Sequence, residues 1–487
     1  MYKKPPKHVQ TARLVILYSI MTLAVLSIVT LLVMMVANYG YNKATGTFEQ
    51  RGLVQFASTP SAATIEIDAA ALPSKTSTKS SVTPGEHRFA IWREGYETWI
   101  SNQYIPEGSL VWLNYIRLVP KELPVTTLHT YETFVDALPS PTNRSILVQT
   151  DTARPEFRFV TIADDEPKGR LLKLPTSTVS ATSQEQKTKT SVTYELDAWD
   201  ESGRYVTVWR VADKKTKELL VIDTTSPEKS VNVSRTFSIP IGAAEFSGRS
   251  GRILYVTVNG SLHKLDIGDG TISRSLISNV AWHAVQDDGT TVAYTTQPDE
   301  STGLRTIGVY RDGDESPTVL RTITNESSPV SIASYRYYGD TYTAITEGHD
   351  FTLYKGHPDQ GLNSLAVVAS RTFSSDITSV EFNETGSQLL LRLGDAFASY
   401  GIDRRLFSEN SLDNAEDLFW LDAMHLGLAE DGALTMRDID GSNVMTLNTV
   451  GASKVPAVLS RKGTYLYSYL PRDDGRVSFQ RVRMILP

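Results

Sequence analysis

The chain contains no cysteine. Disulfide bonds, thiol nucleophiles and zinc or iron–sulfur sites with cysteine ligands are therefore excluded. Small secreted animal modules commonly depend on disulfides, whereas an exported protein without them is held together by packing alone. The absence of cysteine favours a bacterial surface protein if the chain is exported.

Several motifs of catalysis and nucleotide binding are also missing. The eight histidines are scattered, with no H-E-x-x-H and no pair spaced four residues apart. The chain has no G-x-S-x-G, no G-x-x-x-x-G-K-[ST] and no strand-linked G-x-G-x-x-G. We therefore predict no catalytic residue, no cofactor and no metal site, and we expect the protein not to be an enzyme.

Positive charge is scarce outside the N-terminus. The net charge is −7, and Lys3, Lys4, Lys7 and Arg13 precede the first acidic residue. Binding to nucleic-acid phosphates needs clustered Lys and Arg, and no basic stripe follows. The sequence therefore predicts no nucleic-acid partner.

One long apolar run is present, LVILYSIMTLAVLSIVTLLVMMVA over residues 14–37, and it carries no charge. At about 1.5 Å of rise per residue, this run spans a hydrocarbon core of about 30 Å. A cleaved signal peptide has an apolar stretch of about 7–15 residues and a small-residue cleavage site, and this run fits neither requirement. We predict an uncleaved transmembrane helix over residues 14–37 in the plasma membrane. Because the basic residues precede it, residues 1–13 are expected to be cytoplasmic and the bulk of the chain extracellular or periplasmic.

Residues 38–50 are polar and aperiodic and are expected to form a linker. Between residues 51 and 121 short segments alternate apolar and polar side chains, as in TIEID, where Ile65 and Ile67 alternate with Glu66 and Asp68. A period of two predicts strands. We therefore expect a small β domain over residues 51–121.

The order GLVQFASTPSAATIEIDAAAL followed by VTPGEHRFAIWREGYETW resembles the PEGA-domain family of bacterial surface modules. The matching positions are Thr59, Pro60, Ala63, Ile65, Ile67, Asp68, Thr83, Pro84, Gly85, His87, Gly95 and Tyr96. The name-giving motif is replaced by Pro-Ser-Ala-Ala at residues 60–63, and the usual Asp-Gly turn by Asp68-Ala69. The resemblance implies a β-sandwich-like module in which Pro84-Gly85 turn the chain into a strand. His87 has no neighbouring acid and base set in the sequence, so we expect it to serve only at the start of that strand.

Residues 128–487 repeat one unit, in which an apolar strand, a polar or Gly-bearing turn and an alternating strand follow one another. The clearest copies cover residues 196–210, 244–258, 281–296, 380–393 and 457–470, and weaker copies begin near Phe134, Val330 and Leu418. Their spacing of roughly 35–60 residues is the scale of four-stranded propeller blades. The segments LTMRDIDGSNVMTLN and LLVIDTTSPEKSVNVS resemble the outer hairpins of TolB-like, WD40-like repeats.

The fold class is accordingly predicted as mainly β, with one N-terminal transmembrane helix, a PEGA-like domain and a seven- or eight-bladed β-propeller. An array of β-sandwiches is the alternative, since it also gives regularly spaced strands. The Ser/Thr/Lys-rich segment 174–191 is expected to be a long solvated loop between the first two blades.

Three sequence patterns allow both a functional and a purely structural interpretation. The acidic pairs Asp164-Asp165, Asp287-Asp288 and Asp473-Asp474 suit glycoside cleavage or simply solvated turns. Residues 438–443, DIDGSN, suit part of a calcium loop or a hairpin turn, and the absence of a carboxylate at the twelfth loop position favours the turn. Exposed aromatic side chains commonly bind sugars and peptides, whereas aromatic side chains in strands more often pack in the core or against a neighbouring strand. The aromatic residues in question are Tyr335, Tyr337, Tyr338, Tyr342, Trp92, Trp99 and Trp112.

Together these features predict a membrane-anchored extracytoplasmic protein that acts as a non-catalytic binding or scaffold platform. Its expected partners are the membrane, through residues 14–37, and a cell-envelope protein or glycan. The alternative is a glycan-active hydrolase or lyase with carboxylates at the propeller mouth.

Overall fold

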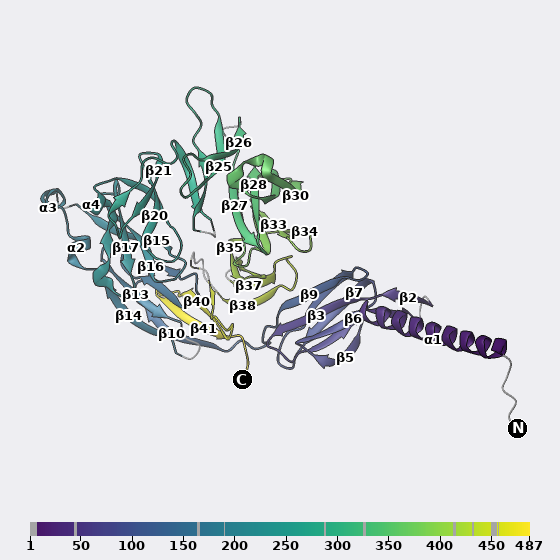
Figure 1. Cartoon of the computed structure of the whole chain (residues 1–487). Coiled ribbons are helices and arrows are strands. Elements are labelled where there is room, and N and C mark those ends of the chain that lie inside the picture. Colours follow the sequence, from purple (N-terminus) through teal and green to yellow (C-terminus); the bar gives the residue numbers. More distant parts are fainter. Residues whose placement is uncertain are drawn as a thin grey trace. The chain divides into compact units, whose positions relative to one another are not determined.

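The computed structural model describes residues 7–42, 46–162, 166–188, 190–286, 289–324, 328–412, 415–430, 433–449, 455 and 457–487. The chain forms two compact units. Unit 1 contains Met1–Glu122 with Ile485–Pro487, and unit 2 contains Leu123–Met484. Figure 1 shows the helix and small sheets of unit 1 and the ring of sheets of unit 2.

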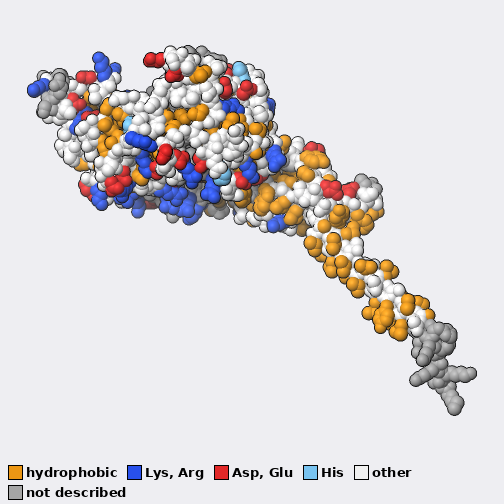
Figure 2. All heavy atoms as spheres, turned by 45° about the horizontal axis from the view of Figure 1, so that its top comes forward, with side chains coloured by type: hydrophobic (Ala, Val, Ile, Leu, Met, Phe, Trp, Pro, Cys, Tyr) orange, Lys and Arg blue, Asp and Glu red, His pale blue; other side chains and the backbone are white. Residues whose placement is uncertain are grey.

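Unit 1 begins with one long helix, α1 (Lys7–Val36). Its part Thr11–Val36 is long and apolar enough to cross a membrane. The leucine, isoleucine, valine and methionine side chains of this part are largely exposed, and Figure 2 shows hydrophobic side chains along it. A helix that is apolar on all sides and whose apolar stretch is not buried matches the transmembrane helix predicted for residues 14–37.

The predicted linker over residues 38–50 instead contains a two-stranded antiparallel sheet of β1 (Tyr39–Asn42) and β2 (Thr47–Gln50). The rings of Tyr41 and Phe48 meet edge to face, with centroids 5.5 Å apart. This pair of aromatic residues on facing strands stabilises the hairpin, and a polar, aperiodic pattern did not reveal it.

The rest of unit 1 is two small sheets around one core. One sheet orders its strands as β6 (Thr78–Val82), β3 (Gly52–Thr59) and β9 (Leu110–Arg117), and β3 and β9 run parallel. The other sheet orders its strands as β5 (Ala70–Lys75), β4 (Thr64–Ile67), β7 (Gly85–Trp92) and β8 (Trp99–Ile105). Their buried faces share a core that includes Phe56, Ile65, Phe89, Trp99 and Leu113.

The stretch TPGEHRFAIWREGYETW folds largely as its residues predict. Gly85 has a φ of 128° at the start of β7, Gly95 has a φ of 82° in the next bend, and Tyr96 is buried on the sheet. His87 lies near the start of β7, as expected, and its Nδ1 also lies 2.6 Å from Oδ2 of Asp68, a contact that the sequence did not predict. Asp68 also accepts a hydrogen bond from the backbone N–H of Arg88, which together with His87 lowers the pKa of Asp68. The contact fastens the turn after β4 to β7.

Unit 2 contains eight four-stranded antiparallel sheets in the part of the chain that the structure describes. The first four are β11 (Asp136–Pro139), β12 (Ser145–Gln149), β13 (Glu156–Thr161), β14 (Lys168–Lys173); β15 (Val192–Trp199), β16 (Tyr205–Ala212), β17 (Thr216–Asp223), β18 (Val231–Asn232); β19 (Ile241–Phe246), β20 (Ile253–Val258), β21 (Ser261–Asp266), β22 (Thr271–Ile272); and β23 (Val280–Val285), β24 (Thr291–Thr296), β25 (Arg305–Arg311), β26 (Thr318–Ile323).

The other four sheets follow the same order along the chain, except for the last. They are β27 (Val330–Tyr337), β28 (Asp340–Glu347), β29 (Asp350–Gly356), β30 (Leu365–Thr372); β31 (Ser379–Phe382), β32 (Gln388–Leu393), β33 (Ala396–Gly401), β34 (Leu406–Ser411); β35 (Ala415–Asp422), β36 (His425–Glu430), β37 (Ala433–Asp438), β38 (Met445–Thr449); and β39 (Val458–Leu459), β40 (Tyr465–Pro471), β41 (Val477–Arg483), β10 (Val125–Tyr131).

These sheets close into a ring, the arrangement of a β-propeller. Each sheet from β11–β14 to β35–β38 shares a hydrophobic cluster with the next, and β10, β40 and β41 share one with the β11–β14 sheet. The first strands are neighbours in four pairs of successive sheets, β11 with β15, β19 with β23, β27 with β31 and β35 with β39. The last sheet joins both ends of unit 2, because β10 pairs antiparallel with β41, Thr127 opposite Gln480. The fold is therefore the predicted propeller rather than an array of sandwiches.

The repeated sequence units coincide with the first two strands of each sheet. In four of the clearer copies the polar residue after the first strand makes the same two backbone hydrogen bonds: its N–H donates to the carbonyl five residues on, and its carbonyl accepts from the N–H three residues on. The four residues are Asp200, Gln286, Asn383 and Ser460. The side chains of Asp200 and Asn383 also accept backbone N–H groups of the turn. These short polar side chains form turns locally, which is why the repeat is readable in the sequence.

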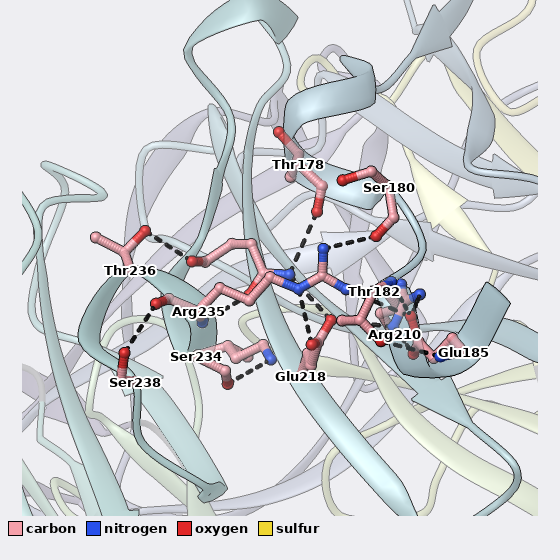
Figure 3. A network of polar contacts seen from close by, with 12 residues as sticks. Thr178, Ser180, Thr182, Glu185, Arg210, Glu218, Ser234, Arg235, Thr236 and Ser238 are labelled. Carbon is pink, nitrogen blue, oxygen red and sulfur yellow. Dashed lines mark hydrogen bonds and ion pairs between the residues drawn. The ribbon is translucent and has the colours of Figure 1, made fainter. Parts of the chain in front are cut away.

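The segment 174–191 lies between the first two sheets, as predicted, and many of its residues are exposed, but it is not a loop throughout. It contains α2 (Thr176–Val179) and α3 (Ser183–Thr188), and Glu185 of α3 forms a two-pronged ion pair with the buried Arg210 of β16, each N–O distance being 2.8 Å. Figure 3 shows Glu218 of β17 and Arg235 of α4 (Val233–Phe237) joining this network. The hydrogen bonds from Arg210 lower the pKa of Glu185 to about 2. Long-range pairing thus holds a segment with little helix propensity against the sheet.

Candidate functional site

A pocket of about 470 Å³ opens between three neighbouring sheets of unit 2. Its walls come from the first strands β15, β19 and β23, from β16 and β20, and from the turn after β20. The lining residues are Asp197, Trp209, Gly242, Ala243, Ala244, Glu245, Thr257, Asn259, Gly260, Val280, Ala281, Trp282 and His283. Polar and aromatic groups from separate sheets therefore converge on one space, as in ligand sites.

Glu245, on β19, is the most unusual group in this pocket. It is half-buried, and its Oε2 accepts a hydrogen bond of 2.6 Å from the backbone N–H of Val285. Among the described residues no Lys, Arg or His forms an ion pair with it. Burial, with a smaller contribution from the charge of Asp197, raises the pKa of Glu245 to about 7. At neutral pH this carboxyl group therefore exchanges its proton easily.

Asp197 is the second carboxylate of the pocket. It is exposed at β15, and its Oδ2 accepts a hydrogen bond of 2.7 Å from the hydroxyl of Thr207. Two acidic groups line this space and none of its lining residues is a Lys or Arg, so the pocket is attractive to a positively charged group.

Aromatic rings and a histidine complete the lining. Trp209 is buried, whereas Trp282 on β23 keeps 43% of its surface exposed. An exposed indole beside carboxylates can stack on a cation or on a sugar ring. His283 is 5% exposed and its Nε2 has no hydrogen-bond partner within the described residues. Burial lowers the pKa of His283, so the ring is neutral at pH 7 and presents one unused nitrogen.

A second glutamate occupies the equivalent place in another sheet. Glu245 precedes Phe246 and lies opposite Tyr255, and Glu381 precedes Phe382 and lies opposite Leu390. Burial raises the pKa of Glu381 as well. In that sheet, however, Arg392 places its guanidinium 3.8 Å from Oε1 of Glu381.

The register identifies the residue that makes the difference. Arg392 of β32 pairs with Ser379 of β31, and Thr257 of β20 pairs with Ala243 of β19. Each is two residues beyond the partner of its glutamate. Thr257 therefore replaces an arginine at this place, and the space that an arginine side chain would fill belongs to the pocket.

A second hollow, of about 620 Å³, lies between the first, second and last sheets. It is lined by Phe134, Val135, Asp136, Gln149, Thr152, Tyr194, Glu195, Leu196, Val455, Pro471 and Val477. Gln149 donates a hydrogen bond of 2.6 Å to the carbonyl of Tyr194, and Glu195 pairs with Lys217 at 3.7 Å. Its polar groups are satisfied within the protein, which makes it the weaker candidate.

The residues singled out in the sequence lie elsewhere. Asp164-Asp165 and Asp287-Asp288 fall outside the described residues, and Asp473-Asp474 lies in the turn after β40, where Asp474 pairs with Arg476 at 2.5 Å. Residues 438–443 lie in the turn after β37, and Asn443 donates to Asp438 at 2.9 Å. In the described ranges no three His, Asp or Glu residues lie close enough to hold a metal ion.

The aromatic residues divide between packing and exposure. Tyr335 packs on Phe382 and donates to the carbonyl of Glu384 at 2.6 Å, and Tyr337 donates to Asp403 at 2.6 Å. Tyr338, in contrast, is 88% exposed. In unit 1, Trp99 is buried while Trp92 and Trp112 are partly exposed. Neither Trp209 nor Trp282 stood out in the sequence, because only the ring of sheets brings them to Glu245.

No protein-family model and no curated protein matches this chain. Several solved structures are similar in fold. One described as the eukaryotic initiation factor is 13% identical, with 70% of this chain and 96% of that chain covered and a TM-score of 0.41. Hsv2p of Kluyveromyces lactis is 11% identical, with coverages of 72% and 98% and a TM-score of 0.39. A chain of the mitotic checkpoint complex is 13% identical, with coverages of 75% and 96% and a TM-score of 0.36. The propeller assignment rests on the strand pairing and core clusters described above.

Proposed function

We propose that this protein is a membrane-anchored, non-catalytic binding platform whose pocket at Glu245 receives a positively charged group of a cell-envelope ligand. The observation that carries the proposal is a half-buried carboxyl group with no Lys or Arg ion-pair partner among the described residues, at a place where another sheet supplies Arg392. A ligand amine or guanidinium would take the place that Arg392 occupies beside Glu381. Trp282 would add a cation–π contact.

The wider architecture fits this role. The helix α1 would cross the plasma membrane, and the basic residues before it favour a cytoplasmic N-terminus, so both β units would lie outside the cytoplasm. The eight sheets would be eight blades, and residues 51–121 would be the PEGA-like module beside the membrane. Propellers present such a rigid set of loops to scaffolds and enzymes alike.

Two classes of envelope ligand carry the required cation. The first is a glycan with free amino groups, and the second is a protein segment with Lys or Arg side chains. The test is calorimetric titration of the full chain in lipid nanodiscs with a glucosamine tetramer and, separately, with a tetra-arginine peptide. The arm that binds identifies the class.

Matched variants decide whether the pocket is responsible. Trp282→Ala is expected to weaken binding about tenfold, since a cation–π contact is worth roughly 1–2 kcal/mol. Glu245→Gln should weaken binding in the same titration, whereas Glu381→Gln should leave it unchanged. Binding of neither probe, or equal affinity in all variants, would contradict the proposal.

A second candidate, glycan hydrolysis, is favoured by one specific feature. Glycosidases pair a carboxylic acid of raised pKa with a second, ionised carboxylate. Glu245, with its pKa of about 7, matches the acid, and Asp197 supplies the second carboxylate. The assay is release of reducing ends from bacterial glycan strands. Release that disappears in Asp197→Asn and Glu245→Gln would establish the enzyme, whereas binding without release would favour the platform.

A further inference from the structure

A cluster of exposed aromatic side chains lies where α1 ends. The helix ends at Val36, and the β1–β2 hairpin begins at Tyr39. The exposed fractions of Tyr39, Tyr41 and Phe48 are 42%, 52% and 63%. Large aromatic side chains are seldom left this exposed together on a water-facing hairpin, so the group calls for a partner.

Hydrogen bonds hold this hairpin against the end of the helix. Asn38 exchanges two bonds with Arg51, each of 2.9 Å, and its side chain accepts a bond of 2.7 Å from Ser81 of β6. Gln50, the last residue of β2, donates to the carbonyl of Ala37 at 3.0 Å. The hairpin therefore cannot swing freely from the helix end.

Two further exposed side chains come from the same end of the sandwich. Leu110 is 47% exposed and lies opposite Leu53 at the start of β3. Tyr104 is 61% exposed and lies opposite Glu86 at the start of β7. Both positions adjoin the junction between β2 and β3. The exposed apolar surface thus continues from the hairpin onto the sandwich.

The length of α1 places this surface at the edge of a bilayer. The uncharged run ending at Ala37 is about 36 Å long as a helix, and a hydrocarbon core is about 30 Å thick. The helix end therefore reaches the headgroup layer, where Tyr and Trp are enriched because their rings are apolar and their polar atoms remain hydrated. A protein partner would not need to sit at this depth.

We infer that the β1–β2 hairpin and the adjoining end of the sandwich are embedded in the headgroup layer of the membrane that α1 crosses, with Tyr39, Tyr41, Phe48 and Tyr104 as interfacial anchors. The partner of this surface is the lipid itself. The inference rests on the proposed membrane anchoring. It implies that the β1–β2 hairpin, in place of the expected linker, fixes the distance between the sandwich and the bilayer.

The absence of cysteine makes a direct test practical, because one introduced cysteine carries one spin label. The full chain is reconstituted in vesicles of phosphatidylethanolamine and phosphatidylglycerol. Labels are placed through Phe48→Cys and Tyr104→Cys. Trp92→Cys, at the opposite end of β7, is the water-exposed control, and Leu23→Cys in α1 is the hydrocarbon control.

Collisions with oxygen and with a water-soluble nickel reagent report the depth of each label. We expect nickel accessibility at Phe48→Cys and Tyr104→Cys to be about threefold or more below that at Trp92→Cys, as an interfacial position requires. Equal nickel accessibility at all three sites would overturn the inference.

The hydrocarbon control separates two kinds of failure. If the Leu23→Cys label lies in hydrocarbon while the other labels lie in water, only the docking of the hairpin is wrong. If the Leu23→Cys label lies in water, the membrane anchoring itself is wrong. Should Phe48→Cys not fold, Tyr104→Cys decides the question by the same comparison.

Discussion

Glu245 and Glu381 occupy the same place in two sheets of one propeller, yet their surroundings differ by one cation. Arg392 lies 3.8 Å from Glu381, whereas Thr257 stands at the corresponding place near Glu245. Burial raises the pKa of both carboxyl groups. The comparison suggests that an internal cation makes one glutamate structural, and that its absence leaves the other available to a ligand.

Other ionic groups of unit 2 resemble Glu381, because they have partners of opposite charge within the chain. Arg210 faces Glu185 and Glu218, and His425 lies between Asp422 at 2.7 Å and Asp438 at 3.4 Å. Each buried charge has partners from its own chain, as stable interiors require. Changes to these groups should therefore lower stability, whereas changes at Glu245 should alter ligand binding and, above pH 4.5, raise stability.

The largest effect is expected from Arg210→Met. The guanidinium is buried, and its removal takes both short contacts from Glu185 and leaves Arg235 as the remaining cation of the network, which costs about 3–5 kcal/mol of unfolding free energy. Urea denaturation measures this loss. Arg252→Met is the matched control, because Arg252 is 46% exposed and ion pairs exposed to water contribute little to stability. Equal losses in the two variants would show that the network is not what stabilises this sheet.

His425→Gln should follow with a loss of about 2–3 kcal/mol at pH 6, because Asp438 is buried beside it. The two aspartates outweigh burial and raise the pKa of His425 to about 9, from an ordinary value of 6.5. A raised histidine pKa stabilises the folded state fully below pH 6.5, and this contribution disappears as the pH rises to about 9. The wild-type advantage over His425→Gln should therefore shrink between pH 6 and pH 9.5, and a constant difference would contradict the account.

Glu245→Gln, unlike His425→Gln, should raise the stability of the folded protein. The folded pKa of about 7 exceeds the ordinary 4.5, so between these values the unfolded chain ionises while the folded chain keeps its proton. Wild-type protein thus loses stability as the pH rises, by at most about 3 kcal/mol above pH 7. Glu245→Gln should equal wild type at pH 4 and be more stable at pH 8. Glu381→Gln should show a smaller gain, because Arg392 limits the rise in the pKa of Glu381.

The smallest stability effect is expected from Arg392→Thr, which recreates the environment of Glu245 in the other sheet. Both partners are partly exposed, so the loss is about 1 kcal/mol. The informative readout is the NMR titration of Glu381, whose pKa should rise further when the arginine is removed. An unchanged pKa would show that Arg392 does not distinguish the two sites.

Local patterns predicted most of the fold. The turn after each first strand is built from nearby residues such as Asp200 and Asn383, so every copy of the repeat was visible in the sequence. Closure of the ring was not visible, because β10 and β41 are separated by nearly the whole of unit 2. The helices of segment 174–191 were missed for the same reason, since Glu185 meets Arg210 through a distant contact.

No single sequence motif predicted the candidate site. A single glutamate in a strand ordinarily faces water, and Trp282 has no motif around it. One signal was available: aligning the repeats places Thr257 where Arg392 stands. Only the structure shows that this substitution leaves a pocket.

The most direct test of the central claim is to supply Glu245 with the missing cation. Thr257→Arg places a guanidinium at the position of Arg392, beside a carboxyl group that has no cationic partner among the described residues. In the calorimetric titration with the cationic probe that binds wild-type protein, the account predicts that Thr257→Arg abolishes binding while the thermal stability is kept or raised. Undiminished binding by a folded Thr257→Arg variant would contradict it.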